Sequence, residues 1–566
     1  ILLTIRPELT VILYPQWRVP PPAVTRKDGS PRMPSAGSED RIAHRKHVLS
    51  IDLGSGGLKT AIVADTGSVV ASVEVPLTTH LLPGGGAEQD PAEWWQGVRQ
   101  TARQAITASG LAPDDIVAVA CDSQWSVAVP VDDHGEPLMR AVHWMDTRGG
   151  PYNRAIANGF PRIQGYGLFK LLKWLRLTGL APTLSGVDSL GHVLFIQHAY
   201  PEIYARTHKF LEPMDFLTSR LTGRITATQK TMVPFVVTDN RRWGTTAYSD
   251  SLLAMAGLEK TKFPTLIAND GVVGPLAPSV AAELGLSPTT PVVAGVGDSN
   301  ASLIGSGAVH DFDSIIYIGT SLYMTCHLPF KKTDLTHFMT ALPSPFKNRY
   351  YLLGEQGAGG KCVEFYLKQL IYPDDGFATG PKPEDAYIRF NTMASQAPAG
   401  SGGVIFLPWL NGALVPSEAP QARGGFMNLS LNTTRHHMAR AVMEGLAFNN
   451  RWTRRPAEKF IGRPITHFRF SGGGALSDLW SQIHADVLGV PIHQVEDPVN
   501  ATVRGAAFLA LLSLNHIALE DIPDRVNIKR VFQPDPNNRA VYDKMYRQYR
   551  MLFKKNKKIF KALNES

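Results

Sequence analysis

Two glycine-rich turns, each following an apolar run, hold the residues best suited to chemistry. The first lies in residues 48–59 (VLSIDLGSGGLK) and the second in residues 315–321 (IIYIGTS). Each pattern indicates a buried strand that breaks into a tight turn, where small residues let the backbone approach an anion and exposed amides supply positive dipoles. Two such turns, about 265 residues apart, predict two related halves that close on one polyphosphate.

Two carboxylates also follow apolar strands. Asp298 ends the run 292–297, where it can accept a proton from a substrate hydroxyl. With a reference pKa of ~3.9 it is ionised at neutral pH; the alternative role is an N-cap for the helix that follows. Asp52 lies beside the amides of the first turn, where a nucleotide-bound Mg²⁺ ion needs hard oxygen ligands. The alternative for Asp52 is a residue that only shapes the turn.

Three further features carry weaker signals. Lys59 follows the first turn and either contacts a phosphate or points into solvent. Residues 472–475 (GGGA) stand between a strand and a helix, where they can lie against an adenine or cap the helix; they lack the spacing of a dinucleotide fingerprint. His436, His437 and His484 fall in helical stretches without metal-ligand partners, and we interpret them as structural.

The elements that position these residues alternate between strands and helices from Val48 onward. Residues 61–75 read as a hairpin turning at Asp-Thr-Gly-Ser. A helix is predicted at 91–109, because Asp-Pro at its start supplies an N-cap and a proline at the first helical position. The alternation predicts an α/β fold of two domains, residues 48–308 and 309–566.

The bulk composition agrees with an ordinary globular protein of two or more domains. The chain has 566 residues, of which 44% are hydrophobic and 19% charged. Three widely spaced cysteines, Cys121, Cys326 and Cys362, argue against a disulfide scaffold or a zinc site and favour the reducing cytoplasm. No apolar run is long enough to span a bilayer.

The formal charge of +8 comes from the ends of the chain. Residues 1–47 carry a net +4 and residues 541–566 a net +6, which leaves −2 between them, so a nucleic-acid role is not indicated. The Pro- and Arg-rich segment 1–47 is predicted to be a disordered leader. Residues 543–563 predict an amphipathic helix packed on the second domain, with a membrane-surface helix as the alternative.

Taken in order along the chain, these motifs resemble the FGGY family of carbohydrate kinases, and the xylulokinases within it in particular. The family has the two-domain actin-like ATPase fold of hexokinase type, which is ribonuclease H-like. The resemblance runs from about Val48 to the C-terminus. Besides the turns, Asp298 and the triple glycine, it is carried by residues 88–95 (EQDPAEWW), 144–148 (WMDTR) and 213–223 (PMDFLTSRLTG).

The resemblance implies roles for single residues. Asp298 would be the base that takes a proton from the sugar's terminal hydroxyl as it attacks the γ-phosphate of ATP, and Asp52 would coordinate Mg²⁺. The predicted phosphate contacts are Ser55, Gly56, Lys59, Gly319 and Thr320, and the predicted adenosine contacts are Gly360, Gly473 and Gly474. The predicted sugar contacts are Gln124, Trp125, Ser126 and Ser299, together with Asp298.

The substrate contacts depart from the family pattern. Trp125-Ser126 stands where xylulokinases have a Met-His pair, and Ser299 where an Asn usually follows the catalytic aspartate. Residues 411–416 (NGALVP) lack the acid and the Arg of a family stretch. Trp125 instead offers a stacking face for a sugar. The phosphoryl-transfer residues are kept while the sugar contacts have changed.

The sequence therefore predicts an ATP- and Mg²⁺-dependent kinase of a ketopentose, D-xylulose-like, or of a related sugar or polyol. The alternative is a catalytically impaired, regulatory sugar- and nucleotide-binding protein on the same fold; retention of Asp298, Asp52 and residues 319–320 favours the enzyme. We expect a cytoplasmic protein with small-molecule partners, without nucleic-acid or membrane partners. A homodimer is the prior expectation for its assembly.

Overall fold

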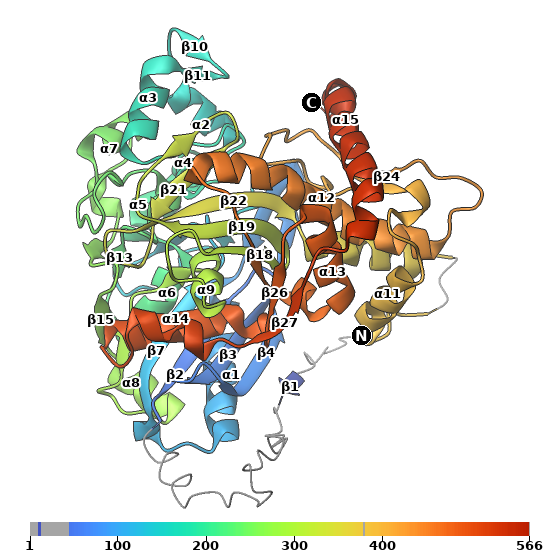
Figure 1. The fold of residues 1–566 in the computed structure, drawn as a ribbon. Helices are drawn as coiled ribbons and strands as arrows, with labels where there is room; N and C mark the ends of the chain where they lie inside the picture. The colour runs from blue at the N-terminus through green and yellow to red at the C-terminus, as the bar shows by residue number, and fades with distance from the viewer. Residues whose placement is uncertain (1–9, 13–44, 377–379, 565–566) are drawn as a thin grey trace, which may run out of the picture.

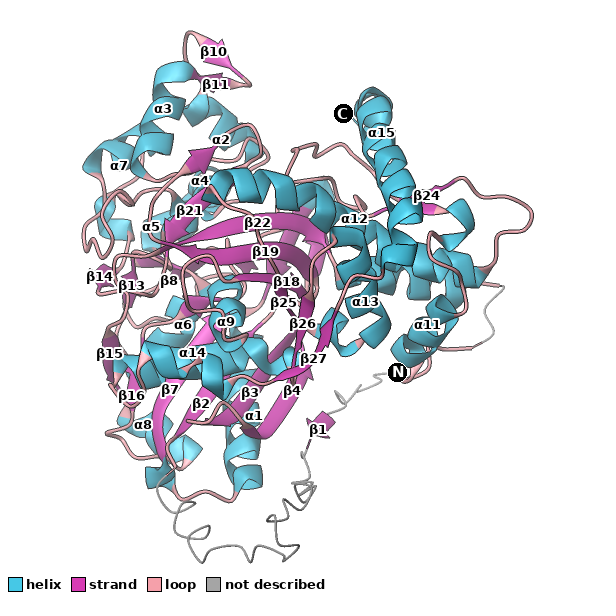
Figure 2. Ribbon diagram, in the orientation of Figure 1, coloured by secondary structure: helices cyan, strands magenta, loops and turns pink. Residues whose placement is uncertain are grey.

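The computed structural model describes residues 10–12, 45–376 and 380–564, which form two lobes, each built on an eight-stranded sheet (Figures 1 and 2). The two-domain α/β fold is thus as predicted. The leader expected at 1–47 lies outside the described residues, apart from 10–12 and 45–47. Residues 10–12 form strand β1, which pairs antiparallel with β4 (Val69–Pro76) at the edge of the first sheet.

The sheet of the N-terminal lobe has the order β1-β4-β3-β2-β7-β16-β15, with β17 beside β7. Its other strands are β2 (His47–Leu53), β3 (Gly57–Ala64), β7 (Ile116–Ser123), β15 (Val272–Pro275), β16 (Pro291–Val293) and β17 (Val296–Gly297). β3 pairs antiparallel with β4, which confirms the predicted hairpin. β7 runs parallel to both β2 and β17, so the carboxyl ends of these three strands meet at one edge.

Helices cover both faces of this sheet. Helix α1 (Pro91–Ser109) forms where it was predicted, because the Asp90 side chain accepts a hydrogen bond from the Ala92 amide at 2.9 Å and Gly110, with φ of 66°, ends the helix. Its buried face packs on alternate residues of β2. Helices α9 (Asp298–Gly305) and α14 (Ala501–Ser513) pack on the opposite face (Figure 1).

The sheet of the C-terminal lobe has the order β20-β21-β22-β19-β18-β25-β26-β27. Its strands are β18 (Ser314–Ile318), β19 (Ser321–Leu328), β20 (Thr333–Asp334), β21 (Met339–Pro343), β22 (Tyr350–Ala358), β25 (Phe468–Ser471), β26 (Ile492–Val495) and β27 (Ile528–Phe532). The lobe also contains α10 (Gly360–Phe365), α11 (Ala386–Ser395), α12 (Arg435–Ile461), α13 (Asp478–Leu488), the ribbon β23 (Ile405–Leu407) and β24 (Gly425–Met427), and α15 (Arg539–Asn564). The boundary predicted at residue 308 lies in the connection between α9 and β18.

The terminal helix α15 packs on the core of the C-terminal lobe. Tyr542, Met545, Tyr549 and Phe553 are buried there, three or four residues apart. This confirms the predicted amphipathic helix and its packing on the second domain. Among the described residues, no helix combines the length and the apolar character that crossing a membrane requires.

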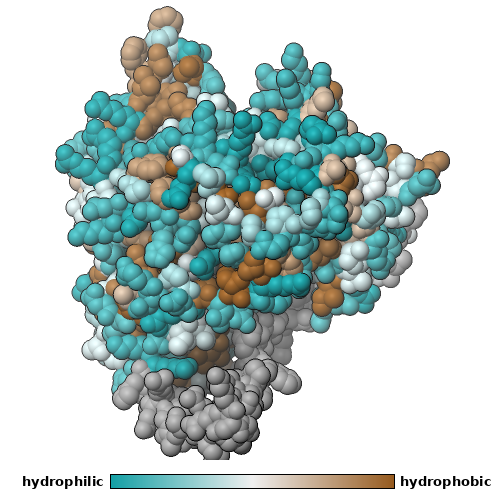
Figure 3. All heavy atoms as spheres, in the orientation of Figure 1, coloured by the Kyte–Doolittle hydropathy of each residue, from teal (hydrophilic) through white to brown (hydrophobic). Residues whose placement is uncertain are grey.

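The rest of the N-terminal lobe includes a helical region with its own core, whereas helices α6 (Pro213–Thr222) and α8 (Pro278–Leu284) pack with α1 on the first sheet. Besides these two helices, the rest of the lobe contains β5 (His80–Leu82), β6 (Gly86–Gln89), β8 (Val129–Val131), β9 (Ala141–Val142), α2 (Gly150–Ala157), β10 (Arg162–Ile163), β11 (Tyr166–Gly167), α3 (Leu168–Leu177), α4 (Ser189–Ala199), α5 (Pro201–Arg206), β12 (Lys209–Leu211), β13 (Thr226–Thr228), α7 (Asp250–Ala256) and β14 (Thr265–Ile267). Exposed apolar side chains, Phe160 and Phe169 among them, gather at the tip formed by β10, β11 and α3 (Figure 3).

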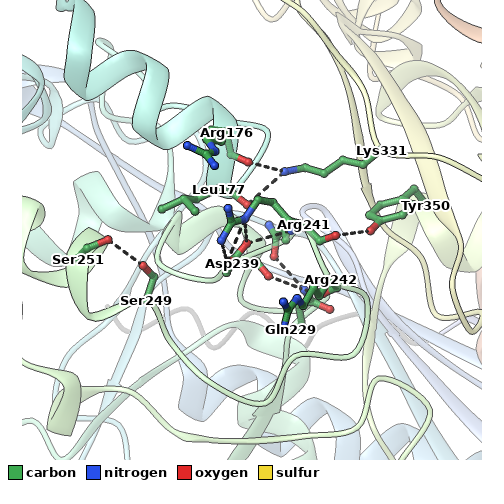
Figure 4. A network of polar contacts seen from close by, with 11 residues as sticks. Arg176, Leu177, Gln229, Asp239, Arg241, Arg242, Ser249, Ser251, Lys331 and Tyr350 are labelled. Carbon is green, nitrogen blue, oxygen red and sulfur yellow. Dashed lines mark hydrogen bonds and ion pairs between the residues drawn. The ribbon is translucent and has the colours of Figure 1, made fainter.

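The lobes touch at several places, including the crossing of α9 with α14 and the helical side of the N-terminal lobe. Helices α9 and α14 cross closely at two glycines: a Cβ on Gly305 would lie 1.8 Å from the Ala501 carbonyl oxygen. On the helical side, Lys331 of the C-terminal lobe donates to the carbonyl of Leu177 at 3.2 Å, and the Tyr350 hydroxyl donates to the Arg241 carbonyl at 3.2 Å (Figure 4).

Candidate active site

Three carboxylates meet at the edge where β2, β7 and β17 end; we call them the acidic cluster. Asp52, the half-buried residue before the end of β2, lies in register with Asp122 of β7. Val296 of β17 is also in register with Asp122, and Asp298 follows β17 as the first residue of α9. The predicted pair Asp52 and Asp298 is therefore brought together, with Asp122 as a third member that the sequence reasoning missed.

Burial raises the pKa of all three carboxyls, and the charges of neighbouring cluster members add to this effect for Asp122 and Asp298. Asp122 is fully buried, neither of its oxygens has a hydrogen-bond partner, and burial followed by the charges of Asp52 and Asp298 raises its pKa well above the ordinary value. Burial, then the Asp52 charge, raises the pKa of Asp298 to about 7, against the effect of the Ser299 amide that donates to it at 2.6 Å. Burial also raises the pKa of Asp52, opposed by the Thr502 hydroxyl at 2.6 Å.

The cluster fits a Mg²⁺ ion that arrives with phosphates. Among the described residues, no three His, Cys, Asp or Glu side chains are arranged to hold a metal by themselves. Mg²⁺ is commonly bound by one or two carboxylates plus substrate phosphates rather than by a protein cage. The unpartnered oxygens of Asp122, beside Asp52, are hard ligands of this kind.

The first glycine turn is held in place by hydrogen bonds within the N-terminal lobe. Its backbone closes through the Gly54 amide and the Gly57 carbonyl at 2.9 Å. The Ser55 hydroxyl accepts a hydrogen bond from the Trp144 indole at 2.8 Å, while Gly56 is exposed. Lys59 donates to the Val499 carbonyl at 3.1 Å and lies 3.7 Å from Glu74, so its ammonium already has partners.

The second glycine turn, Gly319-Thr320, is built by close backbone approach. The Gly360 amide donates to the Gly319 carbonyl at 2.7 Å, and a Cβ on Gly360 would lie 2.6 Å from that same oxygen. Only glycine fits there. Thr320 is exposed at the tip of the turn. The Asp52 charge acts on nearby Tyr317, so this turn lies close to the acidic cluster of the other lobe.

The triple glycine lies beside the second turn because β25 runs parallel to β18. Gly472 has φ of 82°, and a Cβ on it would lie 2.6 Å from the Ile318 carbonyl oxygen. Gly473 is exposed and Gly474 is buried. The predicted adenosine contacts Gly360, Gly473 and Gly474 thus adjoin one turn. His484, interpreted as structural, bonds to Asn450 and to the Trp480 carbonyl.

Gln124 and Trp125, two of the predicted sugar contacts, differ in their burial and in their hydrogen bonds. Gln124 is buried; its Oε1 is 2.8 Å from His143 Nε2, and its Nε2 donates to Gln89 at 2.7 Å. The half-buried Trp125 donates to the Thr231 carbonyl, and its ring lies beside Gly297, where a Cβ would be 3.7 Å away. Trp125 therefore presents a ring next to Asp298, whereas Gln124 holds the segment in place.

Two other predicted contacts are also placed. Ser126 is half-buried with φ of 61°, and the buried Ser299 donates its amide to Asp298. The divergent loop 411–416 approaches β22, where the Val415 amide donates to the Glu355 carbonyl at 3.1 Å. The sequence reasoning missed Glu355: burial, and to a lesser degree the Asp298 charge, raises its pKa to about 8, opposed by the Gly357 amide.

Two lobes on related sheets, with glycine turns beside a carboxylate cluster, define a phosphotransferase of the actin-like ATPase fold. The model of the FGGY family of carbohydrate kinases, N-terminal domain, matches residues 47–305, and that of the C-terminal domain matches residues 315–514. The chain belongs to the FGGY family of carbohydrate kinases, and it is a sugar kinase.

Individual relatives are distant but span nearly the whole chain. Xylulose kinase of Bacillus subtilis (strain 168) is 25% identical over 522 residues, covering 92% of this chain and 99% of that protein. Gluconokinase of Bacillus licheniformis is 22% identical over 505 residues, covering 88% and 94%. The solved xylulose kinase of Lactobacillus acidophilus matches with a TM-score of 0.76 at 24% identity, covering 90% and 98%, which supports the fold.

Proposed function

We propose that this sugar kinase transfers the γ-phosphate of ATP to a hydroxyl of a ketopentose, D-xylulose-like, or of a related sugar or polyol. The position of Asp298 carries this proposal. Its half-buried carboxyl has a pKa of about 7 and lies beside the Trp125 ring and near Tyr317, which precedes the second glycine turn. A base whose pKa lies near the working pH is the most effective in proton transfer.

In this mechanism Asp298 accepts the proton of the attacking hydroxyl. The sugar oxygen forms its bond to the γ-phosphorus while the bond to the β–γ bridging oxygen breaks, and ADP leaves. Asp52 and Asp122 would hold Mg²⁺, whose charge offsets that of the β- and γ-phosphates. The amides and hydroxyls of Ser55, Gly56, Gly319 and Thr320, with Lys59 at the edge, orient the phosphates.

The remaining groups position the acceptor and exclude water. Trp125 supplies a flat face for the sugar, Ser126 and Ser299 adjoin it, and Gln124 orients the segment through His143. Gly360, Gly473 and Gly474 leave room for the adenosine beside the second turn. Closure of the lobes keeps water from competing as the acceptor. Because all three cysteines are unpaired and buried, we infer a reducing compartment such as the cytoplasm.

ADP release tests this function directly. The purified protein is assayed with Mg-ATP and a panel of ketoses, aldoses, sugar acids, polyols and glycerol, with a blank that lacks an acceptor. We expect turnover above the blank with a ketopentose, and Asp298→Asn is expected to lower kcat by roughly 10²–10⁴. The exposed Asp114→Asn is the matched control. ATP binding without turnover on any acceptor would favour the regulatory alternative.

A further inference from the structure

Lys361 crosses from one lobe to the other. It follows Gly360 in α10 of the C-terminal lobe, yet its ammonium lies 5.4 Å from the centroid of the Trp144 ring and 3.7 Å from the Met145 sulfur, both in the N-terminal lobe. The side chain is half-buried. The side chain of Lys361 therefore extends from the C-terminal lobe and places its charge against the N-terminal lobe.

The ammonium of Lys361 has no carboxylate partner among the described residues within ion-pair distance. The one acidic residue that acts on its pKa, Glu364, is itself paired with Lys368 at 2.6 Å. Burial lowers the pKa of Lys361. A thioether and an aromatic face give only partial compensation, whereas buried charges in proteins are normally paired. The ammonium is therefore able to pair with an anion from outside the chain.

Lys361 lies near both glycine turns, one beside its backbone and the other beside the ring that its ammonium faces. On one side, the residue before Lys361 donates its amide to the Gly319 carbonyl at 2.7 Å. On the other side, Trp144, which the ammonium faces, donates to the Ser55 hydroxyl at 2.8 Å. An oxyanion bound by Lys361 is therefore next to the residues of both turns. Lys59, by contrast, is already engaged with Val499 and Glu74.

We propose that Lys361 binds the terminal phosphoryl group of ATP, adding a cation from the C-terminal lobe to the transferring phosphate. This rests on the proposed function. A lysine in this position stabilises the charge on the equatorial phosphoryl oxygens during transfer. An acidic group on the acceptor could supply the same kind of oxyanion. Besides burial, the charge of Lys361 also lowers the pKa of His143, which contacts Gln124 on the sugar side of the site.

Nucleotide binding distinguishes these sources. The affinities of the wild type and of Lys361→Met for Mg-ADP and for the β,γ-imido analogue of Mg-ATP are measured by calorimetry, without an acceptor. We expect the variant to bind the analogue roughly ten- to hundredfold more weakly, the range for a hydrogen bond to a charged group, and ADP within twofold. Lys361→Arg keeps the charge and should recover part of the loss. Lys368→Met, on the same helical segment, is the matched control and should leave both affinities unchanged.

Three results would overturn the proposal. If the variant bound both nucleotides more weakly by the same factor, Lys361 would not contact the terminal phosphate specifically. If nucleotide binding were unchanged and KM rose for acidic acceptors only, the anion that Lys361 binds would be a group of the acceptor. No change in either would leave Lys361 as a link between the lobes. Failure of the sugar assay in the wild type bears on the proposed function alone, because the ratio of the two nucleotide affinities is measured without an acceptor.

Discussion

Replacing Asp298 by Asn should stabilise the ligand-free protein, and more so as the pH rises. The pKa of Asp298 is raised from 3.8 to about 7, and a difference of one in pKa corresponds to about 1.4 kcal/mol. Ionising this carboxyl in the folded protein therefore costs up to about 4 kcal/mol relative to ionising it in the unfolded chain. Asparagine, nearly the same in shape, does not ionise and avoids the cost.

The sign follows from the raised pKa. Below pH 4 the carboxyl is protonated in both states, so the variant gains nothing from the missing charge. Between pH 4 and 7 the unfolded chain loses the proton while the folded protein keeps it, and the wild type is progressively destabilised. Above pH 7 both states are ionised and the advantage of Asp298→Asn reaches its full value. The variant that loses turnover should thus be the more stable enzyme at pH 8.

Thermal unfolding of the two proteins from pH 4.5 to pH 8.5, without nucleotide or Mg²⁺, measures this difference. Asp114→Asn removes an exposed carboxyl and serves as the control, with no pH-dependent difference expected. A stability difference between Asp298→Asn and the wild type that stays constant over this range would refute the reasoning. It would mean that Asp298 keeps an ordinary pKa, and with it the argument for a base poised near neutrality would fall.

Three further substitutions test other parts of the site. Trp125→Ala removes the stacking face, and we expect KM for the acceptor to rise about tenfold with ADP affinity unchanged; an unchanged KM would remove Trp125 from the sugar site. Asp122→Asn should weaken the binding of Mn²⁺ with ADP, followed by electron paramagnetic resonance, by about tenfold; equal affinity would exclude Asp122 as a ligand. Gly305→Ala places a Cβ 1.8 Å from the Ala501 carbonyl oxygen and should destabilise the protein by about 3 kcal/mol, whereas Gly425→Ala, with nothing within 4 Å of its Cβ, should be tolerated; equal melting temperatures for these two variants would contradict the close helix crossing.

Features set by neighbouring residues could be predicted from the sequence. Helix α1 begins and ends where its local signals place it, because Asp90 and Gly110 act within one turn of the chain. The hairpin of β3 and β4 likewise needs only its turn residues and its alternating pattern. Asp52 and Asp298 could be singled out because each follows an apolar run.

Features that depend on distant residues could not. Asp122 is significant only because β2 and β7, far apart in the sequence, pair in the register that sets it opposite Asp52. Lys361 follows a glycine turn and looks like a solvated lysine until the other lobe is placed against it. The sequence likewise did not indicate that the amide of Gln124, a predicted sugar contact, is held by His143 and Gln89.

Helix α14 connects a late part of the sequence with the first sheet and its acidic cluster. It lies late in the sequence but packs on the first sheet, where Val503 accepts a hydrogen bond from the Ser50 hydroxyl at 2.7 Å and Thr502 donates to Asp52. Until residues 501–513 have been synthesised, that face of the sheet lacks the part of its cover that α14 supplies, and Asp52 lacks the hydroxyl of Thr502. A nascent chain therefore completes its acidic cluster only after residues 501–513 have been made.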